Sequence, residues 1–235
     1  MVPNWTDIEV ISFDCYGTLI DWEAGILGAL KPVLANHGVT LADRDILECY
    51  ARFESGLQQG EYLDYRSVLR AVVGAFGRHC GFVPAAAEVG CLEESLPGWR
   101  PFSDTVGALQ ALKPRYRLIV LSNIDDDLFA GTAPHLEIAF DQVITAQQLR
   151  SYKPALQNFR ELIRRSGTGP KGILHVAESL YHDIAPARQL GLRSVHVDRG
   201  GGRAGSGATL SMAAEPDLVV PDLRSVVGAV FGVGG

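Results

Sequence analysis

Side chains that can do chemistry follow several apolar segments of this 235-residue sequence. They include carboxylates, hydroxyls, an amide and a lysine, at Asp14 and Thr18, Ser122 and Asn123, Lys153, and Glu178, Ser179 and Asp183. Taken singly, each could be a helix cap or a solvated side chain. Four separate segments with such endings argue for a shared polar site, provided that the fold brings the endings together.

The elements that would position these groups are six short buried strands separated by helical stretches. Continuous β-branched runs with helices between them predict a parallel sheet covered on both faces, in a doubly wound α/β fold. In such a sheet all carboxyl ends lie at one edge, where ligands bind. The expected strands are Ile8 to Phe13, Arg117 to Leu121, Gln142 to Thr145, Ile173 to Ala177, Ser194 to Val197 and Leu218 to Val220. Core helices are expected at Asp104 to Leu112, Pro154 to Ser166 and Leu180 to Leu190.

Roughly a hundred residues separate the first two strands, which is too many for one crossover helix. This interval contains helical patterns, at Ala24 to Asn36, Arg44 to Gln58, Tyr65 to His79 and Ala85 to Ser95. It is either a decoration of the core or a cap inserted over the carboxyl ends of the sheet. We favour the cap, because the insert begins directly after the polar end of the first strand. The predicted domains are a core of residues 1–21 and 98–235 and a helical cap of residues 22–97.

The composition limits the partners and the compartment. The formal net charge is −6, from 21 basic and 27 acidic residues, which gives no electrostatic reason to bind nucleic acid or anionic lipid. No apolar run is long enough to span a membrane. The four cysteines are scattered, which is typical of reduced thiols. With no secretory signal in view, a cytoplasmic protein is expected.

Four motifs resemble those of the haloacid dehalogenase superfamily, in order and spacing, over nearly the whole chain. They are Phe13-Asp14-Cys15-Tyr16-Gly17-Thr18-Leu19, Leu121-Ser122-Asn123, Tyr152-Lys153-Pro154, and Glu178-Ser179 through to Asp183. The long insert after the first motif is similar to the helical cap of the dehalogenase-type members. The resemblance implies a Rossmann-like parallel sheet with an inserted, all-helical cap.

The resemblance also implies catalytic roles. Asp14 would be a nucleophile that forms an ester with the substrate, and Lys153 would keep its carboxylate ionised and oriented. Asp183 would orient Lys153 or the hydrolytic water. Backbone N–H groups after the nucleophile would stabilise developing negative charge. The other catalytic candidates would bind substrate or hold the nucleophile by hydrogen bonds: Thr18, Ser122 and Asn123.

The residue two positions after the nucleophile favours carbon over phosphorus as the reacting atom. Phosphatases of the superfamily carry a second Asp there, which protonates the leaving alkoxide, whereas this chain has Tyr16. A phenol with a pKa of about 10 is a poor proton donor near neutrality. The Asp-x-Tyr-Gly-Thr form is similar to type II (S)-2-haloacid dehalogenases. We therefore expect carbon–halide hydrolysis at the alpha carbon of a small 2-substituted carboxylate, with no cofactor required.

Three alternatives stay open. Ala177 to Asp183, Phe13 to Trp22 and Gly207 to Thr209 also resemble L-azetidine-2-carboxylate hydrolase, which opens a strained ring by the same nucleophilic logic. A Mg²⁺-dependent phosphatase is the second alternative, because Glu178 occupies the place of a metal-binding acid in those enzymes. Asp14, Glu178 and Asp183 would hold the ion if Mg²⁺ is bound. The third is a catalytically silent protein that binds a metabolite or a protein.

A small anionic substrate calls for a cationic partner, most naturally an arginine from the cap. Arg52 is the first candidate and Arg66 the second. The remaining substrate-binding candidates are Cys15, Tyr16, Trp22 and Ser179, although the Cys15 thiol itself is expected to be a buried apolar filler. The expected partner is a small carboxylate, and a homodimer is left open.

Overall fold

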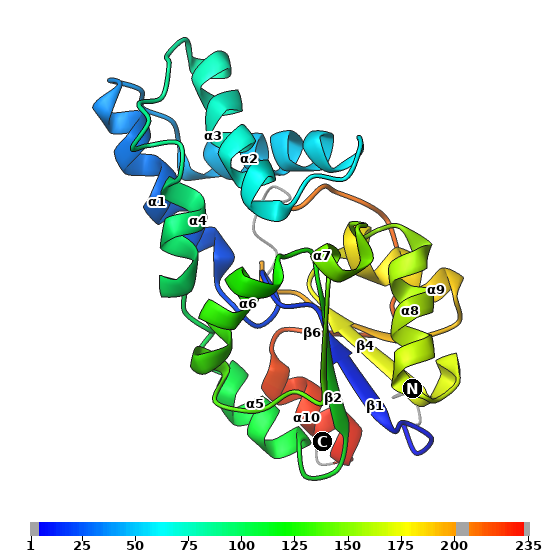
Figure 1. Ribbon diagram of the computed structural model, residues 1–235. Coiled ribbons are helices and arrows are strands. Elements are labelled where there is room, and N and C mark those ends of the chain that lie inside the picture. Colours follow the sequence, from blue (N-terminus) through cyan, green and yellow to red (C-terminus); the bar gives the residue numbers. More distant parts are fainter. Residues whose placement is uncertain (1–4, 201–206, 233–235) are drawn as a thin grey trace.

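The core is a six-stranded, fully parallel sheet with the order β3-β2-β1-β4-β5-β6 (Figure 1). The computed structural model describes residues 5–200 and 207–232. All six expected strands are confirmed, with ends that differ by two residues at most. They are β1 (Val10–Phe13), β2 (Arg117–Ser122), β3 (Gln142–Thr145), β4 (Ile173–Ala177), β5 (Arg193–Val197) and β6 (Leu218–Val220).

Alternation along the strands divides the core into two layers. Val10, Ile119 and Ile173 pack against the helices α8 and α9 on one face of the sheet. Their chain neighbours, among them Ile11 and Leu118, face the layer that contains α5 and α10. The side-chain period of two therefore explains why both sheet faces are buried. The core helices are α5 (Thr105–Leu112), α6 (Asp126–Thr132), α7 (Ala146–Leu149), α8 (Leu156–Ser166), α9 (Ala185–Gln189) and α10 (Leu223–Phe231).

The insert between β1 and β2 is a helical cap above the carboxyl ends of the strands (Figure 1). Its helices are α1 (Trp22–Asn36), α2 (Asp43–Gln58), α3 (Tyr65–Cys80) and α4 (Cys91–Ser95). The fold class is therefore confirmed, whereas the domain boundaries of residues 1–21, 22–97 and 98–235 stay predictions. The expected helix from Ala85 to Ser95 is wrong over its first part, because residues 86–90 form turns and only Cys91–Ser95 is helical.

The expected helix from Leu180 to Leu190 is also not regular. It begins as a π-helical segment, Leu180–Ile184, and continues as α9. Single π-helical turns are frequent at functional sites, because the wider turn re-aims the side chains on it. Here the π-helical turn carries Asp183, whose side chain is buried.

The strand order reverses direction between β1 and β4, which are neighbours in the sheet. In open α/β sheets this topological switch point opens a crevice at the carboxyl ends of the strands. Asp14 follows β1 and Glu178 follows β4, so the fold places two of the four motifs on either side of that crevice.

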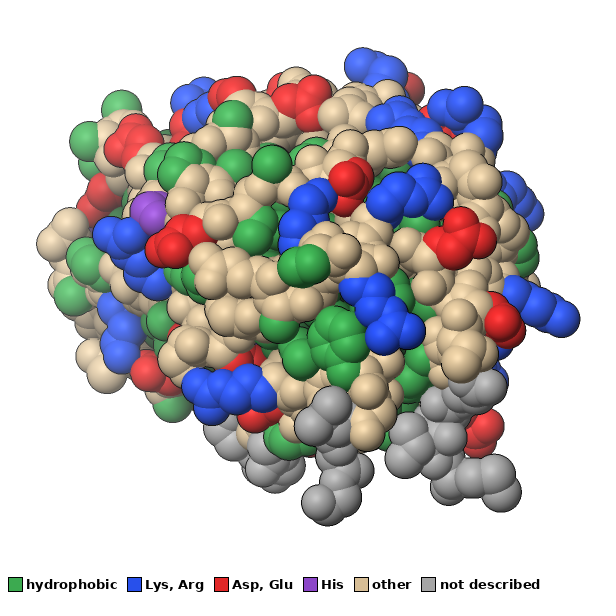
Figure 2. Space-filling view, turned by 90° about the horizontal axis from the view of Figure 1, so that it is seen from below, with side chains coloured by type: hydrophobic (Ala, Val, Ile, Leu, Met, Phe, Trp, Pro, Cys, Tyr) green, Lys and Arg blue, Asp and Glu red, His purple; other side chains and the backbone are tan. Residues whose placement is uncertain are grey.

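The surface at the end opposite the cap has mixed charge. Figure 2 shows Lys and Arg side chains dispersed among acidic and apolar ones on this face. None of the described helices is both long and apolar enough to cross a bilayer.

Candidate active site

A tight turn after β1 brings Thr18 back onto Asp14. The N–H groups of Leu19 and Ile20 both donate to the Cys15 carbonyl, at 2.7 and 3.0 Å. Gly17 lies within this turn at φ +95°, where an added Cβ would stand 2.8 Å from the indole nitrogen of Trp22, so the turn requires glycine. The Thr18 hydroxyl then donates to Asp14 Oδ2 at 2.7 Å. The motif thus holds one oxygen of the carboxylate by its own local fold.

Lys153 binds the other oxygen of Asp14. Its ammonium donates to Asp14 Oδ1 at 2.7 Å, to Asp183 Oδ1 at 2.7 Å and to the Leu121 carbonyl at 3.0 Å. The residue is only 2% exposed, and these three bonds use all three of its N–H donors. Asn123 fixes the lysine backbone, because Lys153 N donates to Asn123 Oδ1 at 2.7 Å and Asn123 Nδ2 donates to Lys153 O at 3.1 Å.

Asp183 is held from behind by a buried pair of side chains on the sheet. His175 Nε2 lies 2.9 Å from Asp183 Oδ1, and Ser12 Oγ lies 2.8 Å from His175 Nδ1. Because a carboxylate only accepts, Nε2 carries a proton, and the Ser12 hydroxyl is hydrogen-bonded to the other ring nitrogen. Ser12 and His175 are fully buried on β1 and β4. This pair of hydrogen bonds therefore supports Asp183 from inside the core and does not reach the pocket.

Burial and mutual charge determine the ionisation of Asp14, Asp183 and Lys153. Burial raises the pKa of Asp14, while the Lys153 charge opposes the rise. Burial works against ionisation of Asp183 as well, but Lys153 and His175 outweigh it and lower the pKa of this carboxyl. Burial disfavours the Lys153 ammonium too, yet the charges of Asp14 and Asp183 raise its pKa above the usual value. Lys153 is therefore charged at neutral pH.

Most of the predicted site residues meet in one pocket between the sheet edge and the cap. Of the predicted catalytic residues, only Thr18 does not line this pocket; it lies behind Asp14 and donates a hydrogen bond to its carboxylate. Tyr16, Trp22 and Ser179, which are predicted to bind substrate, also line this pocket. The lining is Asp14, Tyr16, Trp22, Glu54, Tyr65, Ser122, Asn123, Lys153, Ser179, His182, Asp183 and Thr209. The Tyr16 hydroxyl is hydrogen-bonded to Thr132 Oγ1 at 2.7 Å, and burial raises its pKa well above the ordinary value.

The structure does not place either arginine candidate at this pocket. Arg52 is exposed on α2, where it lies 3.6 Å from Cys49 Sγ and stacks on the ring of Phe53. Arg66 is on α3 and pairs with Asp127 at 2.6 Å. Neither lines the pocket.

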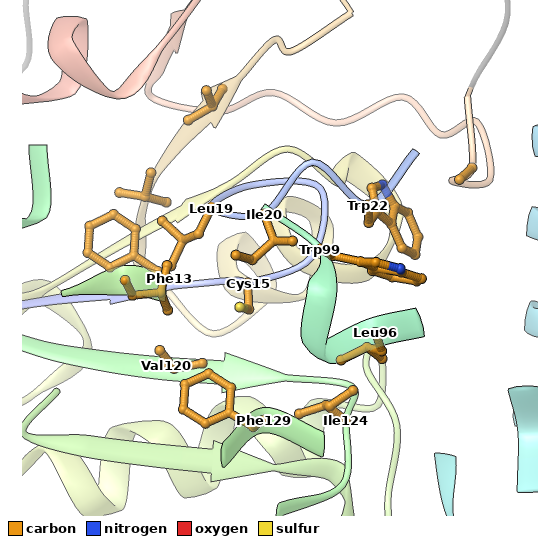
Figure 3. Packing of buried hydrophobic residues seen from close by; sticks show 14 of the residues in the cluster. Phe13, Cys15, Leu19, Ile20, Trp22, Leu96, Trp99, Val120, Ile124 and Phe129 are labelled. Carbon is orange, nitrogen blue, oxygen red and sulfur yellow. The ribbon is translucent and has the colours of Figure 1, made fainter. Parts of the chain in front are cut away.

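Cys15 also lies outside the pocket wall. Its side chain is fully buried in the apolar cluster (Figure 3), as expected for a filler, and burial raises the pKa of its thiol well above normal. It therefore does not supply a substrate contact through sulfur.

The three acids considered for Mg²⁺ do not fit a metal site as the structure arranges them. In the described part of the chain, no three His, Cys, Asp or Glu side chains are placed to hold a metal ion. The Lys153 ammonium stands between Asp14 and Asp183. Glu178 accepts from Thr209 Oγ1 at 3.3 Å, and burial, followed by the charges of Asp14 and Glu23, raises its pKa to about 8.

Glu54 also lines the pocket, although it is not among the predicted site residues. This residue is 3% exposed, and the Tyr65 hydroxyl donates to its Oε1 at 2.7 Å. Burial raises its pKa to about 7, and the negative charge of Asp14 adds to the rise. A signal for it was present, because Glu54 lies on the same helical stripe as Leu47 and Tyr50, and an acid on an apolar stripe marks a buried polar position.

Replacing His175 by Phe should destabilise the protein. The change removes a donor from a buried carboxylate, so the free energy of unfolding should fall by about 1.5–3 kcal/mol. His175→Gln keeps a donor at this position and should lose less. Urea unfolding at pH 7 measures both variants; equal losses would show that Asp183 does not depend on this bond.

Glu54→Gln should change how stability depends on pH. Because the folded pKa of Glu54 is raised from 4.5 to about 7, its protonated form stabilises the fold fully below pH 4.5. That contribution is lost as the pH rises to about 7. Between these two pH values, the free energy of unfolding of the variant should therefore rise relative to that of the parent by up to roughly 3 kcal/mol. Urea unfolding at pH 5 and 8 tests this, with Glu48→Gln, at a partly exposed position on the same helix, as control. Parallel curves for the parent and Glu54→Gln would contradict it.

Several known proteins are similar to this chain over most of its length. Haloacetate dehalogenase H-2 of Moraxella sp. (strain B) is 25% identical over 229 residues, which cover 94% of this chain and 96% of that protein. (S)-2-haloacid dehalogenase 1 of Pseudomonas sp. (strain CBS-3) is 27% identical over 209 residues, or 82% and 85% of the two chains. The structure of the L-2-haloacid dehalogenase of Xanthobacter autotrophicus with chloropropionic acid covalently bound has the same fold, with a TM-score of 0.80 at 21% identity over 97% of this chain and 100% of that one. The family model for haloacid dehalogenase-like hydrolases matches residues 8–191, and the chain therefore belongs to this family of hydrolases.

Proposed function

We propose that the protein hydrolyses a substituent from the alpha carbon of a small carboxylate, with Asp14 as the nucleophile. The observation that carries the choice of carbon over phosphorus is the state of Tyr16. Its hydroxyl is hydrogen-bonded to Thr132, and burial raises its pKa well above normal, so the residue two positions after Asp14 is a poor proton donor for a leaving group. A displacement at saturated carbon that expels a good leaving group does not need this acid.

The surrounding groups support each step. The carboxylate of Asp14 attacks the alpha carbon, the bond to the leaving group breaks, and an ester forms. Lys153 and Thr18 hold one Asp14 oxygen each, which orients the nucleophile before the attack. Ser122 lines the same pocket and can donate to the carboxylate of the substrate.

Asp183 supports the second step. Its Oδ1 is bound to Lys153 and His175, whereas its Oδ2 is buried without a partner among the described residues and Asp183 lines the pocket. Oδ2 can therefore accept a hydrogen bond from the water that attacks the ester carbonyl. Hydrolysis returns Asp14 and releases a 2-hydroxy acid. The Xanthobacter relative with chloropropionic acid covalently bound supports a route through such an ester.

A 2-haloacid is the leading substrate, on the strength of the two dehalogenase relatives. Ring opening of an azetidine carboxylate is the second candidate. The lining favours it in one respect, because it contains an acid, Glu54, and no arginine among the described residues. Both reactions use the same nucleophile and differ in the leaving group.

Asp14→Asn should abolish turnover. We expect purified protein to release chloride from L-2-chloropropionate or chloroacetate, with and without EDTA, and the variant to lose this activity by about 10⁴-fold or more. In a single turnover in ¹⁸O-labelled water, the product should carry unlabelled oxygen, because that atom comes from Asp14.

The control is the far-UV circular dichroism of Asp14→Asn, which should match that of the parent. Chloride release that survives in the variant would contradict the role of Asp14. Phosphate-ester turnover that requires added Mg²⁺, with no chloride release, would favour the phosphatase alternative.

A further inference from the structure

Glu54 places a second carboxyl in the pocket, on the side opposite the sheet. It extends from α2 in the cap, which lies above the carboxyl ends of the strands (Figure 1), whereas Asp14 follows β1. A nucleophile displaces a leaving group from the opposite face of the carbon that it attacks. A substituent displaced by Asp14 therefore departs toward the cap, where Glu54 forms part of the pocket lining.

The groups around this carboxyl favour its acid form. Glu54 is 3% exposed, and its Oε1 accepts from the Tyr65 hydroxyl at 2.7 Å, which leaves Oε2 to carry a proton. The Tyr65 hydroxyl lies 3.0 Å from that of Tyr50, and both phenols are neutral because burial raises their pKa values well above normal. Burial, with a further contribution from the charge of Asp14, raises the pKa of Glu54 to about 7. At pH 6 most of the Glu54 side chains are therefore protonated.

A halide that leaves into this pocket needs a hydrogen-bond donor other than the lysine. Among the described residues of the lining, Lys153 is the only Lys or Arg, and its three N–H donors bind Asp14, Asp183 and the Leu121 carbonyl. His182 lines the pocket too, but burial lowers its pKa to about 4, so it carries no charge at pH 7. An anion in a buried site is costly unless it is hydrogen-bonded.

We propose that Glu54, in its acid form, is a catalytic residue that donates a hydrogen bond to the halide as it leaves the alpha carbon. The inference rests on the proposed function, with Asp14 as the nucleophile at that carbon. An ionised Glu54 would repel the departing halide. The same carboxyl thus favours a halide in its acid form and a cationic group when it is ionised.

This hydrogen bond strengthens during the displacement. An electron pair of Asp14 forms the C–O bond, the carbon–halogen bond breaks, and its pair leaves with the halide. Negative charge thus moves from Asp14 to an atom beside Glu54, where it favours the acid form of this carboxyl still more. An interaction that is stronger in the transition state than in the ground state accelerates the reaction. Glu54 keeps its proton, and the proton that the overall hydrolysis releases comes from the water that attacks the ester.

The pH dependence of halide release tests this role. Because the acid form of Glu54 is required, kcat/KM of the parent should fall by about 10-fold per pH unit above pH 7. Glu54→Gln should remove this fall, since its amide accepts from Tyr65 and donates an N–H at every pH. At pH 6 the variant should stay within about 5-fold of the parent. Glu178, whose pKa burial raises to about 8, titrates in the same range, but a fall caused by Glu178 would persist in Glu54→Gln.

A purely structural role for Glu54 makes a different prediction. Glu54 links α2 to α3 through Tyr65, so a structural loss would slow every substrate alike. Glu54→Met removes the donor at similar size, and L-2-chloropropionate and L-2-bromopropionate differ only in the leaving atom. Chloride accepts hydrogen bonds more strongly than bromide and is the poorer leaving group. At pH 6 the variant should therefore lower kcat/KM by about 30-fold for the chloro acid and by only about 5-fold for the bromo acid.

Glu48→Gln is the matched control, since Glu48 lies on the same helix and pairs with Arg44 at the surface. It should change neither the pH profile nor the ratio of the two substrates. Equal losses for both substrates in Glu54→Met, or a fall above pH 7 that persists in Glu54→Gln, would overturn the proposal.

A binding measurement covers the case in which neither halopropionate is turned over. Asp14→Asn is titrated with sodium bromide at constant ionic strength, at pH 6 and pH 9, and tryptophan fluorescence is recorded. Trp22 lines the pocket, and bromide quenches an indole on contact. Saturable quenching at pH 6 that is lost at pH 9, and that persists at both pH values when Glu54→Gln is added, would uphold the halide contact although the hydrolase function had failed. Quenching that does not saturate, or that ignores Glu54, would overturn it.

Discussion

A buried ammonium between two buried carboxylates is the interaction on which the site depends. Removing three charges from water is costly, and only full hydrogen bonding and mutual attraction compensate for it. Lys153 meets that condition with two carboxylate oxygens and one carbonyl, while Thr18 and His175 bind from the far sides. The net charge of the trio is negative. A carboxyl group held in one orientation at the end of β1 follows from this arrangement.

The topology brings these charges together from distant parts of the sequence. Asp14, Leu121, Lys153 and Asp183 belong to four segments, and they meet because parallel strands all end at one sheet edge. The π-helical turn at Leu180–Ile184 directs Asp183 inward, and Asn123 holds the lysine by its backbone. Local irregularity is thus concentrated where the charges meet, while the strands beneath are regular.

This dependence on topology explains what the sequence could predict. The strands and the four motifs were predictable, because residues at strand ends must converge in a parallel sheet. The cap residues that line the pocket were harder to predict, because the choice between Arg52 and Glu54 depends on which side of the helix faces the pocket. Two positions along a helix correspond to about 200° of rotation, so the two side chains face opposite directions. The positive charge of Arg52 favours it as a partner for an anionic substrate. The apolar stripe of Leu47 and Tyr50, by contrast, indicates that Glu54 lies on the buried side of the helix. The path of residues 86–90 was missed because it has no strong periodicity.

The position of the cap in the chain has a consequence for how such proteins diversify. The insert leaves the core after the first motif and returns before the second, so its helices contribute Glu54 and Tyr65 to the pocket but none of the bonds that Lys153 Nζ makes. The charged centre and this part of the pocket lining therefore come from separate parts of the chain. Mutations on α2 and α3 can retune what enters and what departs, while the charged centre keeps its geometry. A lineage can in this way change the pocket lining without first rebuilding the charged centre.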